Sequence, residues 1–190
     1  ASSLVTALDS AVVVSQVVKR LNSEPDGPWN DQIVMPDQGA YSKEQQAATP
    51  HLRHKRVARA TSMMTALKPI EAYLYEHFTG DLGLQGRSDR LAEIVSAYWG
   101  AVRELCPDCF ERADDYVMLK TPGIFALGRL CLRVMKDMYT GRREWTQSEF
   151  KSFLEACSEL SNPAFWAVGS NEGDRGDAAK YGSMKGFAEL

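Results

Sequence analysis

Long hydrophobic runs are missing from this chain of 190 residues. No stretch approaches the roughly 18 consecutive apolar residues of a membrane-spanning helix, and no charged segment followed by a short apolar core marks a secretory signal. The net charge is only −3, so nothing global attracts nucleic acid or an anionic membrane, and any basic surface must be local. We therefore expect no membrane partner, and without an export signal the four cysteines are expected to be reduced.

Signatures of catalysis are equally sparse. Residues 169–173 and 182–186 are glycine-bounded loops that could hold a phosphate, but neither contains the Gly-Lys-Ser/Thr of a P-loop. The second loop precedes an expected helix, whose N-terminus would attract an anion, so Ser183 and Lys185 are candidate anion-binding residues. The alternative is an ordinary loop before a helix. The sequence predicts no catalytic residue and no cofactor.

The chain does have the composition of a globular domain, with 44% hydrophobic and 25% charged residues. Its length suffices to bury a core without metal or disulfide. We expect an N-terminal helix and an extended linker over residues 1–42, followed by a helical domain over residues 43–190. Both ends read as the interior of a longer protein, so we expect an upstream domain before residue 1.

Apolar residues recur at spacings of three and four, which favours helices. We predict an all-α fold, an irregular bundle of five to seven helices with little or no β-structure. The predicted helices cover residues 3–21, 60–78, 88–105, 121–140 and 146–160.

Local signals add detail to these helices. The buried face of the first helix is expected to contain Leu4, Leu8, Ala11, Val12, Val18 and Leu21. Ser88 is expected to cap the third helix. Pro69 predicts a kink or a junction of two helices. Residues 29–35 are expected to be extended, and residues 169–183 read as a mobile loop.

The strongest functional candidate is a basic stretch over residues 51–59, which contains no acidic residue. Lysines and arginines on one edge of a helix neutralise phosphates and release counterions. The candidate nucleic-acid-binding residues are Arg53, Lys55, Arg56 and Arg59. The alternative is a solvated helix start, or arginines that pair with acids of the upstream domain.

Thiols and imidazoles offer weaker candidates. Cys106 and Cys109 have the spacing of a redox pair or of half a zinc site. The other two cysteines fall on expected apolar helix stripes, so the alternative is two ordinary cysteines at a helix end. His51 and His54 could share a helix face, but no nearby carboxylate or cysteine completes a metal site. We expect no metal.

Residues 116–123 read Tyr-Val-Met-Leu-Lys-Thr-Pro-Gly and pass directly into an apolar helix. Together with residues 19–29, 98–105 and 165–190, this run resembles the C-terminal half of bacterial DGQHR-domain proteins. That group includes regulators associated with DNA sulfur modification. The Asp-Gly-Gln-His-Arg motif itself does not occur in the chain.

The resemblance implies a ParB/sulfiredoxin-like domain before residue 1 and a bacterial cytoplasmic protein associated with DNA phosphorothioation or neighbouring phage-defence systems. Because the motif is missing, the resemblance assigns no active-site role. Two functions compete. The chain is a non-catalytic helical module of a DNA-associated protein, whose first helix packs on the upstream domain or on a second copy. Alternatively, it is part of an enzyme that processes nucleic acid or nucleotides with active residues upstream. The expected partners are DNA, the upstream domain and a second copy of the chain.

Overall fold

The computed structural model describes residues 2–52, 54–169 and 175–180. Within these ranges the chain forms nine α-helices and one pair of two-residue strands, which confirms the predicted all-α class. Five helices of eight residues or more build the bundle, and four helices of four to six residues connect them. None of the helices in these ranges is both long and apolar enough to cross a membrane.

The long helices are α1 (Ser2–Ser23), α3 (Ala60–Leu74), α4 (Leu84–Leu105), α6 (Thr121–Thr140) and α7 (Gln147–Leu154). The short helices are α2 (Lys43–Ala48), α5 (Pro107–Glu111), α8 (Pro163–Trp166) and α9 (Asp177–Lys180). Single turns are η1 (Pro50–Leu52), the π-helical η2 (Tyr75–Thr79) and η3 (Ala113–Asp115). Strands β1 (Ile33–Val34) and β2 (Ala58–Arg59) pair in parallel, with Ile33 opposite Ala58.

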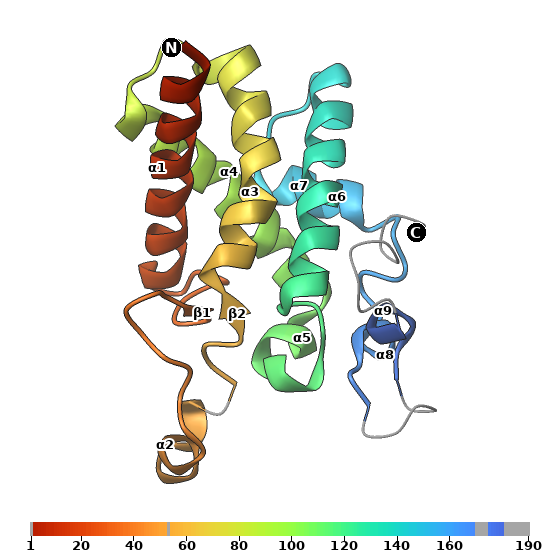
Figure 1. Ribbon diagram of the computed structural model, residues 1–190. Coiled ribbons are helices and arrows are strands. Elements are labelled where there is room, and N and C mark those ends of the chain that lie inside the picture. Colours follow the sequence, from red (N-terminus) through yellow and green to blue (C-terminus); the bar gives the residue numbers. More distant parts are fainter. Residues whose placement is uncertain (1, 53, 170–174, 181–190) are drawn as a thin grey trace.

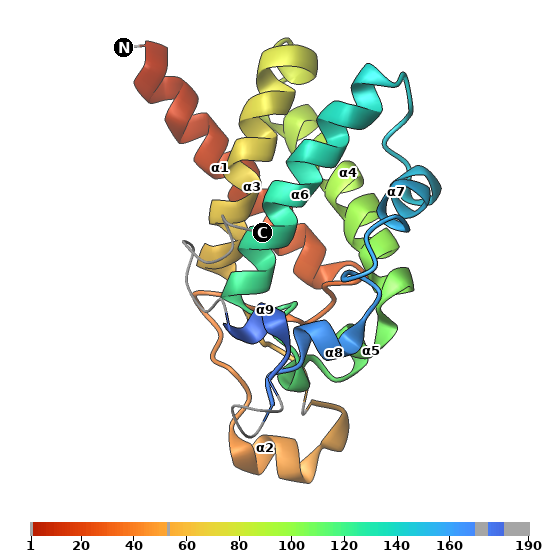
Figure 2. The ribbon, with the colours of Figure 1, turned by 90° about the vertical axis from the view of Figure 1, so that its right-hand side faces the viewer.

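The long helices form two layers. Figure 1 shows α1, α3 and α6 side by side, and Figure 2 places α4 and α7 on the other side of this layer. The apolar stripes of α4 and α6 face the space between the layers, as their sequence periodicity predicts. The buried residues of these stripes are Leu91, Ile94, Val95, Tyr98 and Val102 in α4, and Ile124, Leu127, Cys131, Val134 and Met138 in α6.

The buried face of the first helix only partly matches the predicted one, since Val18 and Leu21 are buried as expected. Leu8 and Val12 are 62% and 43% exposed, so the expectation that they are buried is wrong. Because α1 packs against both α3 and α4, it buries the adjacent positions instead. The buried residues are Val13, Val14, Val17, Val18 and Leu21. Pairs of β-branched valines, which lower helix propensity, thus form the packed side of this helix.

Three local predictions are corrected by the structure. Helix α4 begins at Leu84, one turn before the expected cap, and Ser88 is a buried helical residue that donates a hydrogen bond to Gln16 Oε1 at 2.6 Å. Helix α3 continues through Pro69, so a junction of two helices there is wrong. The loop expected over residues 169–183 is interrupted by α9.

A buried ion pair joins three of the long helices. Glu71 of α3 and Arg87 of α4 are 3% and 5% exposed, and Arg87 Nε donates a hydrogen bond to Glu71 Oε1 at 3.1 Å. Arg87 Nη2 donates to the same oxygen. Ser10 Oγ of α1 donates to Glu71 Oε2 at 2.6 Å, and the Arg87 guanidinium lies 4.3 Å from the centre of the Tyr75 ring. The charges and most of their hydrogen-bonding atoms are therefore satisfied inside the bundle.

We predict that Arg87→Ala lowers the free energy of unfolding by about 3–5 kcal/mol, because it leaves the Glu71 carboxylate buried without its cation. Arg90→Ala is the matched control on the same helix. Arg90 pairs with Glu93 at 2.7 Å at the surface, so its loss should cost less than about 1 kcal/mol. Urea denaturation followed by circular dichroism measures both values. Similar costs for the two variants would contradict a structural role for the buried pair.

Candidate nucleic-acid interface

Within the described residues the basic stretch over residues 51–59 is not an α-helix, so its cations do not share one helix edge. The chain leaves η1 at Leu52 and joins β2, where the Ala58 N–H donates a hydrogen bond to the Gln32 carbonyl at 3.0 Å. Arg56 has a φ of 57°, in the left-handed region, which a helix cannot contain. Arg53 lies outside the described residues.

Two of the predicted nucleic-acid-binding residues hold this loop together. Arg56 Nε donates to Asp31 Oδ1 at 3.0 Å, and its guanidinium lies 4.0 Å from the centre of the Tyr41 ring. Tyr41 in turn donates to Asp31 Oδ2 at 2.8 Å. Burial is the larger cause that raises the pKa of Tyr41, and this hydrogen bond is the second. Lys55 Nζ donates to the Asn30 carbonyl at 2.9 Å. Both cations therefore contact the linker before α2.

Arg59 is exposed and precedes the first residue of α3. The other predicted binding residues, Ser183 and Lys185, lie outside the described residues, as does the glycine loop that contains them. Of the predicted cations, only Arg59 is thus placed at the surface without a described ion pair.

Two stretches of the chain contain no Asp or Glu, residues 45–70 and residues 116–136. The structure brings their helices together, because α3 and α6 pack side by side along most of their length (Figure 1). The two helices therefore contain only two acidic residues, Glu71, which is buried, and Asp137, which is exposed near the end of α6.

Helices α3 and α6 run parallel to one another. The Ser62 and Thr121 hydroxyls lie 2.8 Å apart near the start of both helices, and Lys136 Nζ lies 5.2 Å from the centre of the Tyr73 ring near the end of both. In between, a Cβ added at Gly128 would lie only 3.0 Å from the Ala66 Cβ. Small residues at this crossing allow the two backbones to approach closely, which brings the outer faces of the helices next to each other.

The outer faces of the two helices carry four exposed cations, which we call the α3–α6 face: Lys68, Arg129, Arg133 and Lys136. The three residues of α6 follow one another at spacings of four and three, so they form one stripe that spans roughly 10 Å. In the described ranges none of the four forms an ion pair with a carboxylate. This stripe was not among the predicted binding residues, although the spacing of its three cations and the lack of acids between them are visible in the sequence.

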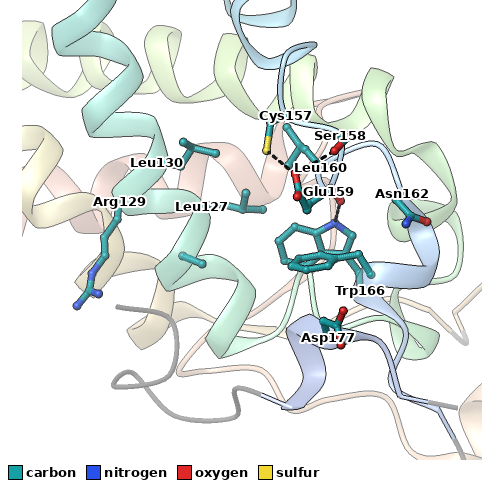
Figure 3. Close-up of a pocket in the computed structure, with 12 residues that line it drawn as sticks. Leu127, Arg129, Leu130, Cys157, Ser158, Glu159, Leu160, Asn162, Trp166 and Asp177 are labelled. Carbon is teal, nitrogen blue, oxygen red and sulfur yellow. Dashed lines mark hydrogen bonds between the residues drawn. The ribbon is translucent and has the colours of Figure 1, made fainter. Parts of the chain in front are cut away.

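A pocket of about 740 Å³ lies beside α6, between this helix and the segment from α7 to α9 (Figure 3). Its apolar wall includes Leu127, Leu130 and Trp166. Trp166 Nε1 donates to the Glu159 carbonyl at 3.0 Å, and Ser158 Oγ donates to Glu159 Oε2 at 3.2 Å. Arg129 lies at its edge, with the side chain directed away from the hollow. The polar contacts thus stabilise the wall itself.

The C-x-x-C pair lies at the junction of α4 and α5 and is fully buried. The Cys106 and Cys109 sulfurs are 3.0 Å apart. The hydrogen bond from the Cys109 thiol lowers the pKa of Cys106, and the same bond raises that of Cys109. Across the described ranges, no group of three or more His, Cys, Asp or Glu residues is arranged to hold a metal ion. His54 Nδ1 instead lies 3.6 Å from Asp114 Oδ2.

We predict that Arg56→Ala lowers the free energy of unfolding by about 1–3 kcal/mol, because it removes charge-assisted hydrogen bonds from a half-buried site. Arg59→Ala, three residues away on the exposed surface, should change it by less than about 0.5 kcal/mol. Thermal and urea denaturation of the two variants test this difference. Equal stabilities would mean that the Arg56 contacts contribute nothing.

The cysteines should differ in reactivity. Cys106, Cys109 and Cys131 are at most 1% exposed, whereas Cys157 is partly exposed. We predict that a thiol-specific disulfide reagent labels one cysteine per chain rapidly in the folded protein, and all four after denaturation. Cys157→Ser should remove the rapid reaction. Rapid labelling of a second thiol would show that the α4–α5 junction opens.

Comparisons with family models, with curated proteins and with solved structures found no match for this chain. Support for a function of this chain therefore comes from the geometry of its described residues and from the resemblance of residues 116–123 and their flanks.

Proposed function

We propose that this chain is a non-catalytic helical module of a DNA-associated bacterial protein, linked to DNA phosphorothioation or to phage-defence regulation, and that it contacts the phosphate backbone through the α3–α6 face. The observation that carries the proposal is the meeting of the two acid-free stretches on one surface of a chain whose net charge is −3. Clustered lysines and arginines gain affinity for nucleic acid by releasing counterions from phosphates.

The spacing of the cations supports a backbone contact. Arg129, Arg133 and Lys136 rise along one helix by roughly 10 Å, a length over which one DNA strand presents about three phosphates along its axis. Lys68 adds a fourth charge from the parallel helix. A contact of this kind positions a module on DNA and carries no sequence information by itself.

The run that carries the resemblance also sets the position of α6. A Cβ at Gly123 would lie 2.2 Å from the Met118 carbonyl oxygen, so this turn requires glycine. Lys120 Nζ donates to the Asp114 carbonyl at 2.7 Å, and burial lowers the pKa of Lys120. The run thus fixes the start of the helix that presents most of the basic face, which connects the resemblance to the proposed contact. The link to sulfur modification itself is supported by the resemblance alone.

The test is fluorescence anisotropy of labelled duplex DNA, plain and phosphorothioated, titrated over a salt series. The variant Lys68→Ala/Arg129→Ala/Arg133→Ala should reduce the slope of log affinity against log salt by about 2 to 3, because each phosphate contact contributes about 0.9. Tighter binding to the phosphorothioated duplex would support the sulfur link. The recovered DNA should remain intact, since the proposal assigns no nuclease activity.

The matched control removes three arginines from α1, α4 and the end of α5 by Arg20→Ala/Arg103→Ala/Arg112→Ala. Arg20 pairs with Asp89 at 2.8 Å, Arg103 Nη1 donates to the Asp26 carbonyl at 2.8 Å, and Arg112 lies 3.5 Å from Asp108. This control has the same net charge as Lys68→Ala/Arg129→Ala/Arg133→Ala but keeps the α3–α6 face. Equal losses in both variants would mean non-specific attraction by net charge. No binding of the wild-type chain at low salt would reject the DNA contact.

A further inference from the structure

Five aromatic rings gather where α3 and α6 end, at the upper ends of these helices in Figure 1. We call them the aromatic patch: Tyr73, His77, Phe78, Tyr139 and Trp145. The Phe78 ring centre lies 4.9 Å from that of Tyr139 and 5.0 Å from that of Trp145, and it lies 5.8 Å from that of Tyr73. Two segments that are distant in sequence, residues 73–78 and residues 139–145, thus form one ring cluster.

Three rings of the aromatic patch lie at the surface, whereas Tyr73 and Trp145 are half-buried and pack against the core. Phe78 and Tyr139 are 38% and 56% exposed, and His77 is exposed as well. Phe78 belongs to η2, the π-helical turn that continues α3, and this type of turn occurs frequently at functional sites. Large apolar side chains left at the surface in one cluster mark an interaction site more often than isolated ones do.

Cations surround the aromatic patch and join it to the α3–α6 face. Lys136, the last cation of that face, lies 5.2 Å from the centre of the Tyr73 ring, and Arg90 lies 5.8 Å from that of Trp145. Arg142 follows α6 and is exposed. Carboxylates also lie nearby. Glu93 pairs with Arg90, and Glu149 lies 3.4 Å from Arg143. Exposed acids also adjoin the patch in sequence: Glu76, which lies 3.8 Å from His77, and Asp137 and Glu144, which have no described ion pair.

Arg142 occupies an unusual backbone position. Its φ is 57°, in the left-handed region, and its N–H donates to the Tyr139 carbonyl at 2.9 Å to close the end of α6. Glycine is the usual residue in such a helix end because a side chain strains this conformation. A charged residue therefore stands beside the aromatic patch at some cost in stability, which is typical of functional positions.

We propose that the aromatic patch binds unpaired nucleotides, so that a single strand continues from the α3–α6 face onto its rings. Exposed rings beside a basic groove stack on bases of any sequence, whereas the bases of an intact duplex are not accessible to them. The inference rests on the proposed nucleic-acid contact and adds the substrate class, single-stranded DNA or a locally opened duplex. A protein surface is the competing partner for exposed aromatic residues.

The test compares a labelled oligothymidylate of about 16 nucleotides with a blunt duplex of equal length. The variant Phe78→Leu/Tyr139→Leu keeps apolar volume but removes two rings. It should bind the single strand about tenfold more weakly, because a tenfold change corresponds to the loss of one stacked base. Its affinity for the duplex should stay within about twofold of the wild-type value. Quenching of Trp145 fluorescence by the single strand, assigned with Trp145→Phe, gives an independent signal.

Arg142→Gly is the second variant, because glycine suits the left-handed backbone and should leave the fold at least as stable. It should nevertheless weaken single-strand binding severalfold. Wild-type binding to duplex but not to the single strand would overturn this inference and leave the proposed function standing. Unchanged single-strand affinity in Phe78→Leu/Tyr139→Leu would likewise overturn it and favour a protein partner. No binding of either DNA would reject both proposals.

Discussion

A buried carboxylate that cannot be left without a cation determines how the helices of this protein fit together. Glu71 is the one acidic residue of α3, and it faces inward to Arg87 of α4 while Ser10 of α1 donates to its second oxygen. Inside a protein, such a pair is stable only when both charges are fully hydrogen-bonded, so the rotation of α3 about its axis is restricted. The inward position of Glu71 also keeps its negative charge away from the outer face of α3. The same contact that orders the bundle therefore leaves Lys68 on an outer face of α3 that has no acidic residue in this helix.

The second constraint is the close approach of α3 and α6. Gly128 next to Ala66 brings the two backbones together, and the hydroxyl contact between Ser62 and Thr121 aligns their first turns. Because the helices are parallel, a residue near the end of one lies near the end of the other. This is why Lys136 reaches Tyr73 and why Phe78 reaches Tyr139. The basic face and the aromatic patch are consequences of one packing arrangement.

The sequence predicted what depends on local periodicity and missed what depends on contacts between distant residues. The stripes of α4 and α6 could be read because one face of each is buried along its whole length. The buried face of α1 was predicted to contain Leu8 and Val12, which are exposed. A run of valines offers several nearly equivalent apolar faces, and only packing against α3 and α4 determines which of them is buried. The start of α4 was placed at Ser88, since serine is a good N-cap, but Ser88 is used to bind Gln16 across the bundle.

The candidate site likewise has features that the sequence shows and features that only the fold shows. The lack of acids around residues 51–59 was visible, but the ion pair between Arg56 and Asp31 joins residues 25 positions apart, and the left-handed φ of Arg56 gives no local signal. A strand of two residues is also too short to be recognised from alternation, so β2 was not predicted. The spacing of Arg129, Arg133 and Lys136 is visible in the sequence. Only the structure shows that this stripe lies beside α3, where it adjoins Lys68.

The parallel direction of α3 and α6 also has an electrostatic consequence. The peptide dipoles of each helix sum to about half a positive charge at the N-terminus and half a negative charge at the C-terminus. In antiparallel neighbours these partial charges cancel, but here the two positive ends coincide near Ser62 and Thr121, and the two negative ends coincide near the aromatic patch. The outer face is thus polarised along its length. The cations Lys136 and Arg142 stand at the end where the backbone is most negative, and they offset a field that would otherwise repel an anionic strand.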